Sequence, residues 1–339
     1  MKFSSDVLRL DLAAEIQSTT SKIREVVLQR LHRKGAVISV SGGIDSAACA
    51  ALCTRALGKE NVLLLFLPER DSSPESLRLG KTLAEKLGVP TLTVEIAPIL
   101  EAAGCYRSQR EAVRMVFPKY TDEWKFKITL PSILSSNRLN VSRLTVEIPG
   151  GEVRSERMPA AAYLQLVAAT NFKQRTRKML DYYHADRLNY AVCGTPNRLE
   201  YDQGFFVKGG DGLADFKPIA HLYKTQVYEI ARALGVPDEI CRRTPTTDTF
   251  SLPQTQEEFY FALPYDKMDL CLLGHNEKIP AAQVAPVVGL TTEQVERVYR
   301  DIDVKRRTTL PLHLPALLME DVPQIAQMKD GAVHPKEGA

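Results

Sequence analysis

The sequence lacks the features that would indicate a membrane, zinc-ribbon or nucleic-acid-binding protein. No apolar run is long enough to span a bilayer, and the N-terminal stretch 1–6 has no signal-peptide core. The six cysteines include no C-x-x-C pair, which argues against a zinc ribbon or dithiol centre. The formal net charge of +3 is close to zero, and the basic residues are dispersed. We expect a cytoplasmic enzyme that binds neither membrane nor nucleic acid.

Several familiar catalytic patterns are also missing. There is no Walker A sequence, no G-x-G-x-x-G, no Ser/His/Asp or Cys/His grouping, and no internal repeat. The chain has 339 residues, of which 44% are hydrophobic and 25% charged, an ordinary composition for one large domain. Cys49 and Cys53 lie one helical turn apart and are expected to be small core residues rather than ligands.

Apolar runs and helical patterns alternate through the first hundred residues. This alternation predicts an α/β fold with a doubly wound, mostly parallel sheet and helices on both faces. An amphipathic helical segment over 6–33 precedes it. The expected elements are strands over 36–41, 62–67 and 91–96, and helices over 46–57 and 74–88.

The regular alternation fails at about 105–160, where we expect an inserted hairpin or small subdomain. One domain is predicted over 1–319, followed by a mobile tail over 320–339. Tyr163, Tyr182 and Tyr183 are interpreted as packing residues, and His184 receives no role. The remaining expected elements are strands over 125–130, 144–148 and 188–193, and helices over 161–186 and 223–234.

The most informative stretch is Ser-Gly-Gly-Ile-Asp-Ser, between the first predicted strand and the next helix. Glycines let backbone N–H groups turn toward an anion, and the following helix N-terminus favours phosphate. The alternative is an ordinary glycine turn capped by its Asp or Ser. The stretch resembles the pyrophosphate-binding loop of N-type ATP pyrophosphatases. The residues assigned to ATP here are Ser39, Val40, Ser41, Gly42, Gly43, Ile44, Asp45 and Ser46.

Further motifs appear in one order along the second half of the chain. They read GT-x-x-x-x-E, G-F-F-x-K-x-GDG-x-x-D, L-x-K and P-T-x-D, preceded by N-x-x-x-R-x-R and followed by YD-x-M-D. In this combination the chain resembles the ammonia-dependent NAD synthetase family, over roughly 36–100 and 165–307. The matching segments are Asn171–Arg177, Gly194–Glu200, Gly204–Asp215, Leu222–Lys224, Pro245–Asp248 and Tyr265–Asp269.

The resemblance implies an ATP site with a metal. Asp45 and Glu200 each follow a predicted strand, and parallel strands would bring them to one sheet edge. The resemblance gives both to Mg²⁺ and gives Lys224 to the ATP phosphates. It adds Thr195 and Thr246 as further ATP contacts. Taken alone, Glu200 reads as a solvated helix residue and Lys224 as a surface lysine at a helix start.

The same resemblance implies an acceptor site. It places Asp211 near the incoming ammonia, where a carboxylate helps ammonium to deprotonate, so Asp45, Asp211 and Lys224 are the expected catalytic residues. Side-chain capping of the turn is the alternative for Asp211 and is compatible with that role. The residues assigned to deamido-NAD are Asn171, Arg175, Lys208, Asp215 and Lys305.

The implied reaction is the amidation of deamido-NAD through an acyl-adenylate, with ATP and Mg²⁺ required. The nicotinate carboxylate attacks the α-phosphate, pyrophosphate leaves, and ammonia then displaces AMP. No extra domain with a cysteine nucleophile is present for glutamine hydrolysis, so we expect free ammonia or a separate glutaminase partner. The family implies a homodimer with deamido-NAD at the subunit interface.

The chain departs from the family pattern at two places. The family's closing His-Lys pair reads Val304-Lys305 here, and the 105–160 insertion is longer than the compact pattern. We consider three roles for the insertion: it covers the site, it builds an interface, or it accepts another acid as substrate. Three alternatives stay open: a paralogous ligase for a different carboxylate, a tRNA-modifying ATP pyrophosphatase, and a non-catalytic nucleotide-binding subunit. The second predicts a basic face and often catalytic or zinc cysteines, and neither is evident in the sequence. The retained Asp45, Glu200, Lys224 and Asp211 argue against the third.

Overall fold

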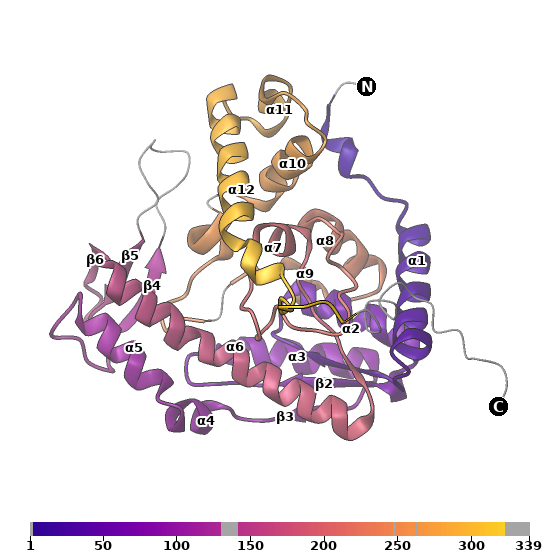
Figure 1. Ribbon diagram of the computed structural model, residues 1–339, viewed down its shortest axis with the longest axis horizontal. Coiled ribbons are helices and arrows are strands. Elements are labelled where there is room, and N and C mark those ends of the chain that lie inside the picture. Colours follow the sequence, from indigo (N-terminus) through magenta and orange to yellow (C-terminus); the bar gives the residue numbers. More distant parts are fainter. Residues whose placement is uncertain (1–2, 130–141, 247–248, 262, 323–339) are drawn as a thin grey trace.

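A parallel four-stranded sheet lies at the centre of the computed structural model, which describes residues 3–129, 142–246, 249–261 and 263–322 (Figure 1). The strand order is β3-β2-β1-β7. Both neighbours of β1 run parallel to it, which confirms the predicted α/β sheet. The strands are β1 (Ala36–Ser39), β2 (Val62–Phe66), β3 (Thr91–Thr93) and β7 (Ala191–Val192).

Helices cover both faces of this sheet, as predicted. Successive side chains of a strand point to opposite faces, so Ile38 packs into one core and Val37 into the other. The first core is covered by α1 (Leu12–Arg24), α2 (Ile44–Leu57), α3 (Pro74–Leu87), α8 (Lys224–Ala233) and α9 (Asp238–Arg242). The second is covered by α4 (Ala97–Ala102), α5 (Cys105–Arg114) and α6 (Ala160–Leu188).

Most element bounds agree with the sequence to within two or three residues, and β7 is the main exception. A strand was expected over 188–193, but α6 continues to Leu188, and Asn189 ends it in the left-handed conformation with φ 55°. Only Ala191–Val192 therefore remain extended. The N-terminal amphipathic segment is helical in three stretches, Ser5–Leu8, α1 and Glu25–Arg30.

The insertion contains an antiparallel sheet of order β4-β5-β6 in the described residues. The expected hairpin is β4 (Lys125–Thr129) with β5 (Arg143–Glu147), and β6 (Val153–Arg157) was not predicted because it is charged and largely exposed. Phe126 of β4 and Val146 of β5 face a core shared with α5 and α6. The insertion is thus built onto the same helices that cover the central sheet.

The C-terminal helices form a further cluster beside the sheet, at the top of Figure 1. It contains α7 (Arg198–Gln203), a helical stretch Glu257–Phe261, α10 (Tyr265–Asn276), α11 (Ala281–Val288) and α12 (Thr292–His313). Of the predicted tail, 323–339 lies outside the described residues. All six cysteines are buried and free, which confirms the core interpretation of Cys49 and Cys53. In the described part of the chain, no helix is both long and apolar enough to cross a bilayer.

Candidate active site

A cavity of about 660 Å³ opens where β1 and β7 end. The register pairs Ala36 with Ala191 and Val37 with Val192, so both strands leave the sheet at the same edge. The loop after β1 and the segment after β7 therefore lie side by side at this edge, and both line the cavity, as expected for parallel strands. The predicted site residues that line it are Ser39, Val40, Ser41, Gly43, Ile44, Asp45, Ser46, Asn171, Arg175, Thr195, Glu200, Lys208, Asp211, Lys224 and Thr246.

The loop after β1 depends on one of its two glycines. Gly42 has φ +72°, and a Cβ there would lie 2.5 Å from the carbonyl oxygen of Ser76. Gly43 has φ −93°, which any residue adopts, and it stands at the N-cap of α2. The Ser46 hydroxyl donates to the Gly43 carbonyl at 3.0 Å and accepts from the Ser41 N–H at 3.3 Å. The first turn of α2 is thus held against the cavity, where a helix N-terminus favours anions.

Asp45, Glu200 and Lys224 form the charged centre of the cavity. The Lys224 ammonium donates to Asp45 Oδ2, and the Asn197 amide donates to Asp45 Oδ1 at 3.0 Å. Glu200 belongs to the capping box of α7, where its carboxylate accepts from the Asn197 N–H at 3.2 Å. Glu200 is 9% exposed and Lys224 is fully buried, so the readings of solvated helix residue and surface lysine are both wrong.

The protonation of Glu200 is set by its surroundings. Burial raises the pKa of this carboxyl to about 8, helped by the nearby charge of Asp45 and opposed by that of Lys224. Two acids and one ammonium therefore share the centre with less negative charge than their number suggests. A divalent cation beside them would favour the ionised form of Glu200.

Lys224 is placed by an acid from the C-terminal helical cluster. Asp269 of α10 accepts the backbone N–H groups of Lys224 at 3.2 Å and Thr225 at 2.7 Å, and so caps the start of α8. Burial raises the pKa of Asp269 to about 6, although these N–H groups oppose the shift. The position of the lysine thus depends on a contact 45 residues further along the chain.

The donor set suits Mg²⁺ shared with a ligand. Carboxylate oxygens are the groups that Mg²⁺ prefers, and it commonly binds one or two of them together with substrate phosphates. Among the described residues, no group of three or more His, Cys, Asp and Glu is arranged to hold a metal. Asp45 and Glu200 are therefore the residues that would hold Mg²⁺, and substrate phosphates and water would have to supply its other ligands.

The cavity is also lined by Asp211, Arg175 and Lys208. Asp211 accepts the Val207 N–H at 2.8 Å, so it caps its turn and also lines the cavity. Burial raises the pKa of its carboxyl. The Arg175 Nε donates to the Lys208 carbonyl at 3.2 Å. The Lys208 ammonium donates to the carbonyls of Pro311 at 2.8 Å and Leu314 at 3.0 Å, which caps the end of α12.

Three predicted site residues are not among those that line the cavity. Gly42 allows the turn of the loop after β1 through its positive φ and its close approach to Ser76. Asp215 accepts from the Val192 N–H at 2.7 Å and from the Tyr182 hydroxyl at 3.1 Å. Lys305 pairs with Asp301 at 2.7 Å and donates to the carbonyl of Tyr260, a cavity residue, at 2.8 Å. The assignments of Asp215 and Lys305 to the substrate stay predictions.

The cavity also contains charged residues that sequence reasoning missed. The Ser39 hydroxyl donates to Asp181 Oδ1 at 2.5 Å, and Asp181 pairs with Lys178 at 2.8 Å. Lys178 and Asp181 follow Arg175 at helical spacing on α6, a signal that would have found them. Arg243 donates to the Gly42 carbonyl at 3.3 Å, and its place after α9 gave no local signal.

The three tyrosines of α6 differ from one another. Tyr182 packs against the second sheet core, which confirms its interpretation as a packing residue. Tyr163 is 37% exposed and lines the cavity, and Tyr183 is 59% exposed, so the packing interpretation is wrong for both. Helical periodicity alone did not separate the two faces of α6, because apolar residues occur on both.

Comparison with known proteins identifies the family of this chain. The family model described as NAD synthase matches residues 15–117 and 134–308. The NH(3)-dependent NAD(+) synthetase of Mesorhizobium japonicum is 58% identical over 316 residues, covering 93% of this chain and 99% of the relative.

Solved structures extend the likeness to the fold. NMN synthetase from Francisella tularensis has a TM-score of 0.61 at 22% identity and covers 91% of this chain and 99% of its own. NH3-dependent NAD synthetase from Campylobacter jejuni has a TM-score of 0.60 at 22% identity and covers 92% and 100%. On the sequence match and the shared architecture together, this chain belongs to the NAD synthase family.

Proposed function

We propose that this chain is an ammonia-dependent NAD synthetase, a ligase that amidates deamido-NAD and converts ATP to AMP and pyrophosphate. The observation that carries the proposal is the meeting of Asp45, Glu200 and Lys224 at one end of the cavity that Arg175 and Lys208 line. The relative from Mesorhizobium japonicum, 58% identical, is named for this activity. Because the proposed substrates are charged nucleotides, we place the enzyme in the cytoplasm.

In the first step, a carboxylate oxygen of deamido-NAD attacks the α-phosphorus of ATP, and the bond to the bridging oxygen of the β-phosphate breaks. The N–H groups at the start of α2 and the hydroxyl of Ser41 bind the departing pyrophosphate, and Ser46 holds the turn that presents them. The Lys224 ammonium neutralises phosphate charge. Mg²⁺, when held by Asp45 and Glu200, would stabilise charge on the same phosphates. The chain needs no side-chain nucleophile.

In the second step, ammonia attacks the carbonyl carbon of the adenylate, the bond to the AMP oxygen breaks, and the added nitrogen loses one proton to the departing AMP or to water. Asp211 is the group proposed to accept the proton from ammonium. Its carboxylate is held by the Val207 N–H, and its raised pKa makes it a better proton acceptor than an exposed aspartate. Alignment of the reacting groups accounts for much of the rate, on the order of 7–11 kcal/mol in well-oriented systems.

A direct assay tests the acceptor. Purified protein with Mg-ATP and ammonium is given deamido-NAD, and AMP and NAD are quantified by chromatography. Equal amounts of both are expected, and AMP at background level would sink the proposal. AMP formed only with a different carboxylate would assign the chain to another amide ligase. That result would draw attention to Val304, which replaces the family's histidine and is 45% exposed on α12.

The ammonia source is tested in the same assay. Ammonium should support NAD formation, whereas glutamine alone should not. Glutamine-dependent formation that requires a second purified protein would identify a separate glutaminase partner. Glutamine-dependent formation by this chain alone would contradict the proposed ammonia dependence.

We also propose a homodimer built on α6. Leu164, Phe172, Met179 and Tyr183 are 66%, 38%, 54% and 59% exposed. At about 100° per residue, their side chains fall within an arc of about 100° on the helix. Such an apolar stripe favours a protein partner, and Arg175 on the same helix lines the cavity. Sedimentation velocity should show a dimer, and Met179→Lys should produce a monomer.

A further inference from the structure

One wall of the cavity, which we call the wall segment (residues 249–256), is fastened to parts of the chain far from it in sequence. Thr249, Phe250 and Gln256 of this segment line the cavity. Thr255 forms an antiparallel bridge with Thr246, the residue proposed to contact ATP. The position of the wall segment therefore sets that of an ATP contact.

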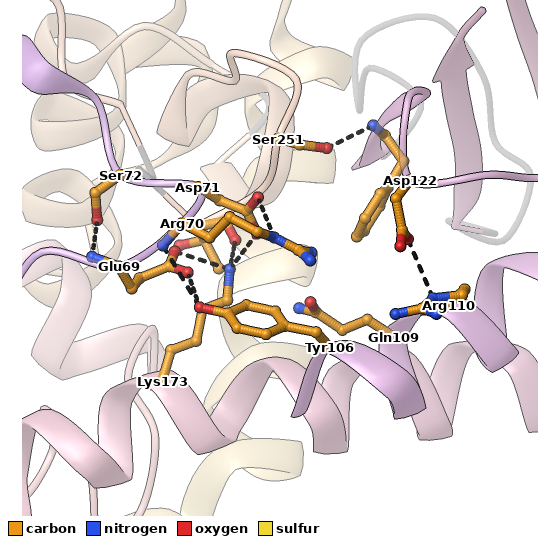
Figure 2. Close-up of polar contacts among 12 residues, drawn as sticks. Glu69, Arg70, Asp71, Ser72, Tyr106, Gln109, Arg110, Asp122, Lys173 and Ser251 are labelled. Carbon is orange, nitrogen blue, oxygen red and sulfur yellow. Dashed lines mark hydrogen bonds and ion pairs between the residues drawn. The ribbon is translucent and has the colours of Figure 1, made fainter. Parts of the chain in front are cut away.

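The first fastening is a buried ammonium on α6. Lys173 is 0% exposed, and its Nζ donates to the Thr249 carbonyl at 2.9 Å, to Glu69 Oε1 at 2.9 Å and to Asp71 Oδ2 at 2.7 Å (Figure 2). The Tyr106 hydroxyl donates to the second oxygen of Glu69 at 2.9 Å. All three ammonium protons are used, as a buried charge requires. Lys173 thereby joins the wall segment, through Thr249, to the loop after β2, through Glu69 and Asp71.

The second fastening is the outer edge of β4. The Phe126 N–H donates to the Ser251 hydroxyl at 2.9 Å, and the Leu252 N–H donates to the Phe126 carbonyl at 3.1 Å (Figure 2 shows Ser251). The Lys127 ammonium donates to the Pro253 carbonyl at 3.3 Å and pairs with Glu258 at 3.0 Å.

Buried side-chain contacts add to this edge. The Gln254 amide donates to the carbonyl of Ile128, and Ile128 itself lines the cavity. The rings of Phe126 and Phe250 meet edge-on at 5.8 Å between centroids. β4 lies within residues 118–133, which the family match skips. This chain thus uses inserted sequence to hold a cavity wall.

We propose that Lys173 and β4 are positioning elements for the ATP site: they fix the wall segment, and through it Thr246, before ATP binds. The inference rests on the proposed function, because it takes ATP to be the ligand of this wall. A wall ordered in advance removes an entropy cost that would otherwise fall on binding. Loosening the wall should therefore weaken ATP binding and raise the KM for ATP more than it lowers kcat.

The test uses Ser251→Ala and Lys127→Ala, which remove polar contacts between β4 and the wall segment without touching the charged centre. Lys125→Ala is the matched control, since Lys125 is exposed on the same strand. We expect the Kd and KM for ATP to rise roughly 3- to 10-fold in each variant and further in the double variant. The control and the KM for deamido-NAD should stay within about twofold.

Lys173→Met is measured in the same way and should raise the KM for ATP at least as much. If this variant does not fold, the Ser251 and Lys127 variants decide. Unchanged Kd and KM for ATP in those variants would overturn the inference. So would a uniform fall of all kinetic constants that follows the melting temperature, because that is what a merely structural contact produces.

The design separates this inference from the proposed function. Binding of Mg-ATP is measured by titration calorimetry without any acceptor, and NAD formation is measured separately in the wild type. A wild type that binds ATP but makes no NAD overturns the proposed function while the variant affinities still test the inference. A wild type that makes NAD, with variants of unchanged ATP affinity, overturns the inference alone. A wild type that binds no ATP overturns both.

Discussion

Two buried lysines, Lys224 at the cavity and Lys173 behind it, lie in similar surroundings but differ in whether a ligand can reach them. Each is fully buried, each lies among two carboxylates, and each has a tyrosine ring centroid within 6 Å, at 5.2 Å from Tyr265 and 5.9 Å from Tyr106. Lys173 donates its protons to Glu69, Asp71 and the Thr249 carbonyl. Thr249 lines the cavity, whereas Lys173 and the two acids do not. Lys224, Asp45 and Glu200 all line the cavity.

The difference shows that a buried ammonium among acids does not by itself mark a catalytic centre. Breaking a buried pair is costly where the charge left behind has no second partner that can take its place. Two features separate the lysines. Lys224 lines the cavity, where a ligand could reach it, and its neighbour Glu200 has a raised pKa, so that the charge of Glu200 would change when a cation binds nearby. Variants at the two centres should therefore have opposite signatures.

The largest effect is expected at the cavity centre. Asp45→Asn removes a proposed Mg²⁺ ligand and should lower kcat/KM for NAD formation by roughly 10²- to 10³-fold. Its free energy of unfolding should change by less than about 1 kcal/mol, because Glu200 can ionise and take over the pairing with Lys224. Asp238→Asn, a surface acid with a 77% exposed side chain, is the control. Full activity of Asp45→Asn would remove this residue from the metal site.

The opposite signature is expected at the second lysine. Lys173→Met leaves Glu69 and Asp71 buried without their ammonium and should lower the free energy of unfolding by about 3–5 kcal/mol. At saturating ATP, kcat per folded molecule should change far less than in Asp45→Asn. Urea denaturation followed by circular dichroism measures the loss, with Lys125→Met as the exposed control. If Lys173→Met lowers the free energy of unfolding by less than about 1 kcal/mol, the change is no larger than that expected for Asp45→Asn, and the proposed difference between the two lysines is wrong.

A smaller loss is expected from the tyrosine behind Lys173. Tyr106→Phe removes the hydroxyl that donates to Glu69 while keeping the ring, which is 2% exposed. A hydrogen bond to a charged group contributes about 1.5–3 kcal/mol, so the free energy of unfolding should fall by that amount. Tyr201→Phe, at a 36% exposed position outside the cavity lining and the proposed dimer stripe, should be neutral in the same urea titration. Equal losses in both variants would contradict the account.

The last comparison is a pH dependence of stability at Asp269, behind Lys224. Asp269 has a pKa of about 6 in the folded chain, against about 3.9 when unfolded. Because the folded state holds the proton more tightly, this group stabilises the fold below about pH 4, and the contribution is lost as pH rises through about 6.

The measurement compares wild type with Asp269→Asn, which cannot titrate. Relative to that variant, the wild type should lose up to about 1.4 kcal/mol of unfolding free energy per pH unit between about pH 4 and 6. Urea titrations across pH 4–7 give the difference. A constant difference over this range would show that Asp269 does not titrate in the folded chain.

The sequence predicted the central sheet and the meeting of Asp45 with Glu200 because both follow from local patterns. Apolar runs, glycine turns and helical periodicity locate β1, β2 and the helices between them, and parallel strands bring their carboxyl ends together. The resemblance to a family then supplied Lys224 and Asp211, which no local pattern would have separated from ordinary surface residues. Family membership itself is confirmed by the comparisons.

The misses have physical causes that a single sequence hides. β6 was overlooked because an exposed, charged strand carries no apolar alternation. Arg243 reaches the Gly42 carbonyl across 201 residues of chain, and no spacing rule describes such a contact. Tertiary packing, not local preference, decided each of these.

The contact between Asp45 and Lys224 spans 179 residues, and this distance governs when the site can exist. On the ribosome, the phosphate loop and α2 emerge long before α8 is made, so Asp45 waits without its ammonium partner while most of the chain is synthesised. Long-range closure of this kind slows folding relative to local contacts. The order of synthesis therefore delays assembly of the charged centre. A chain interrupted before Lys224 contains the whole loop after β1 but lacks the ammonium that pairs with Asp45.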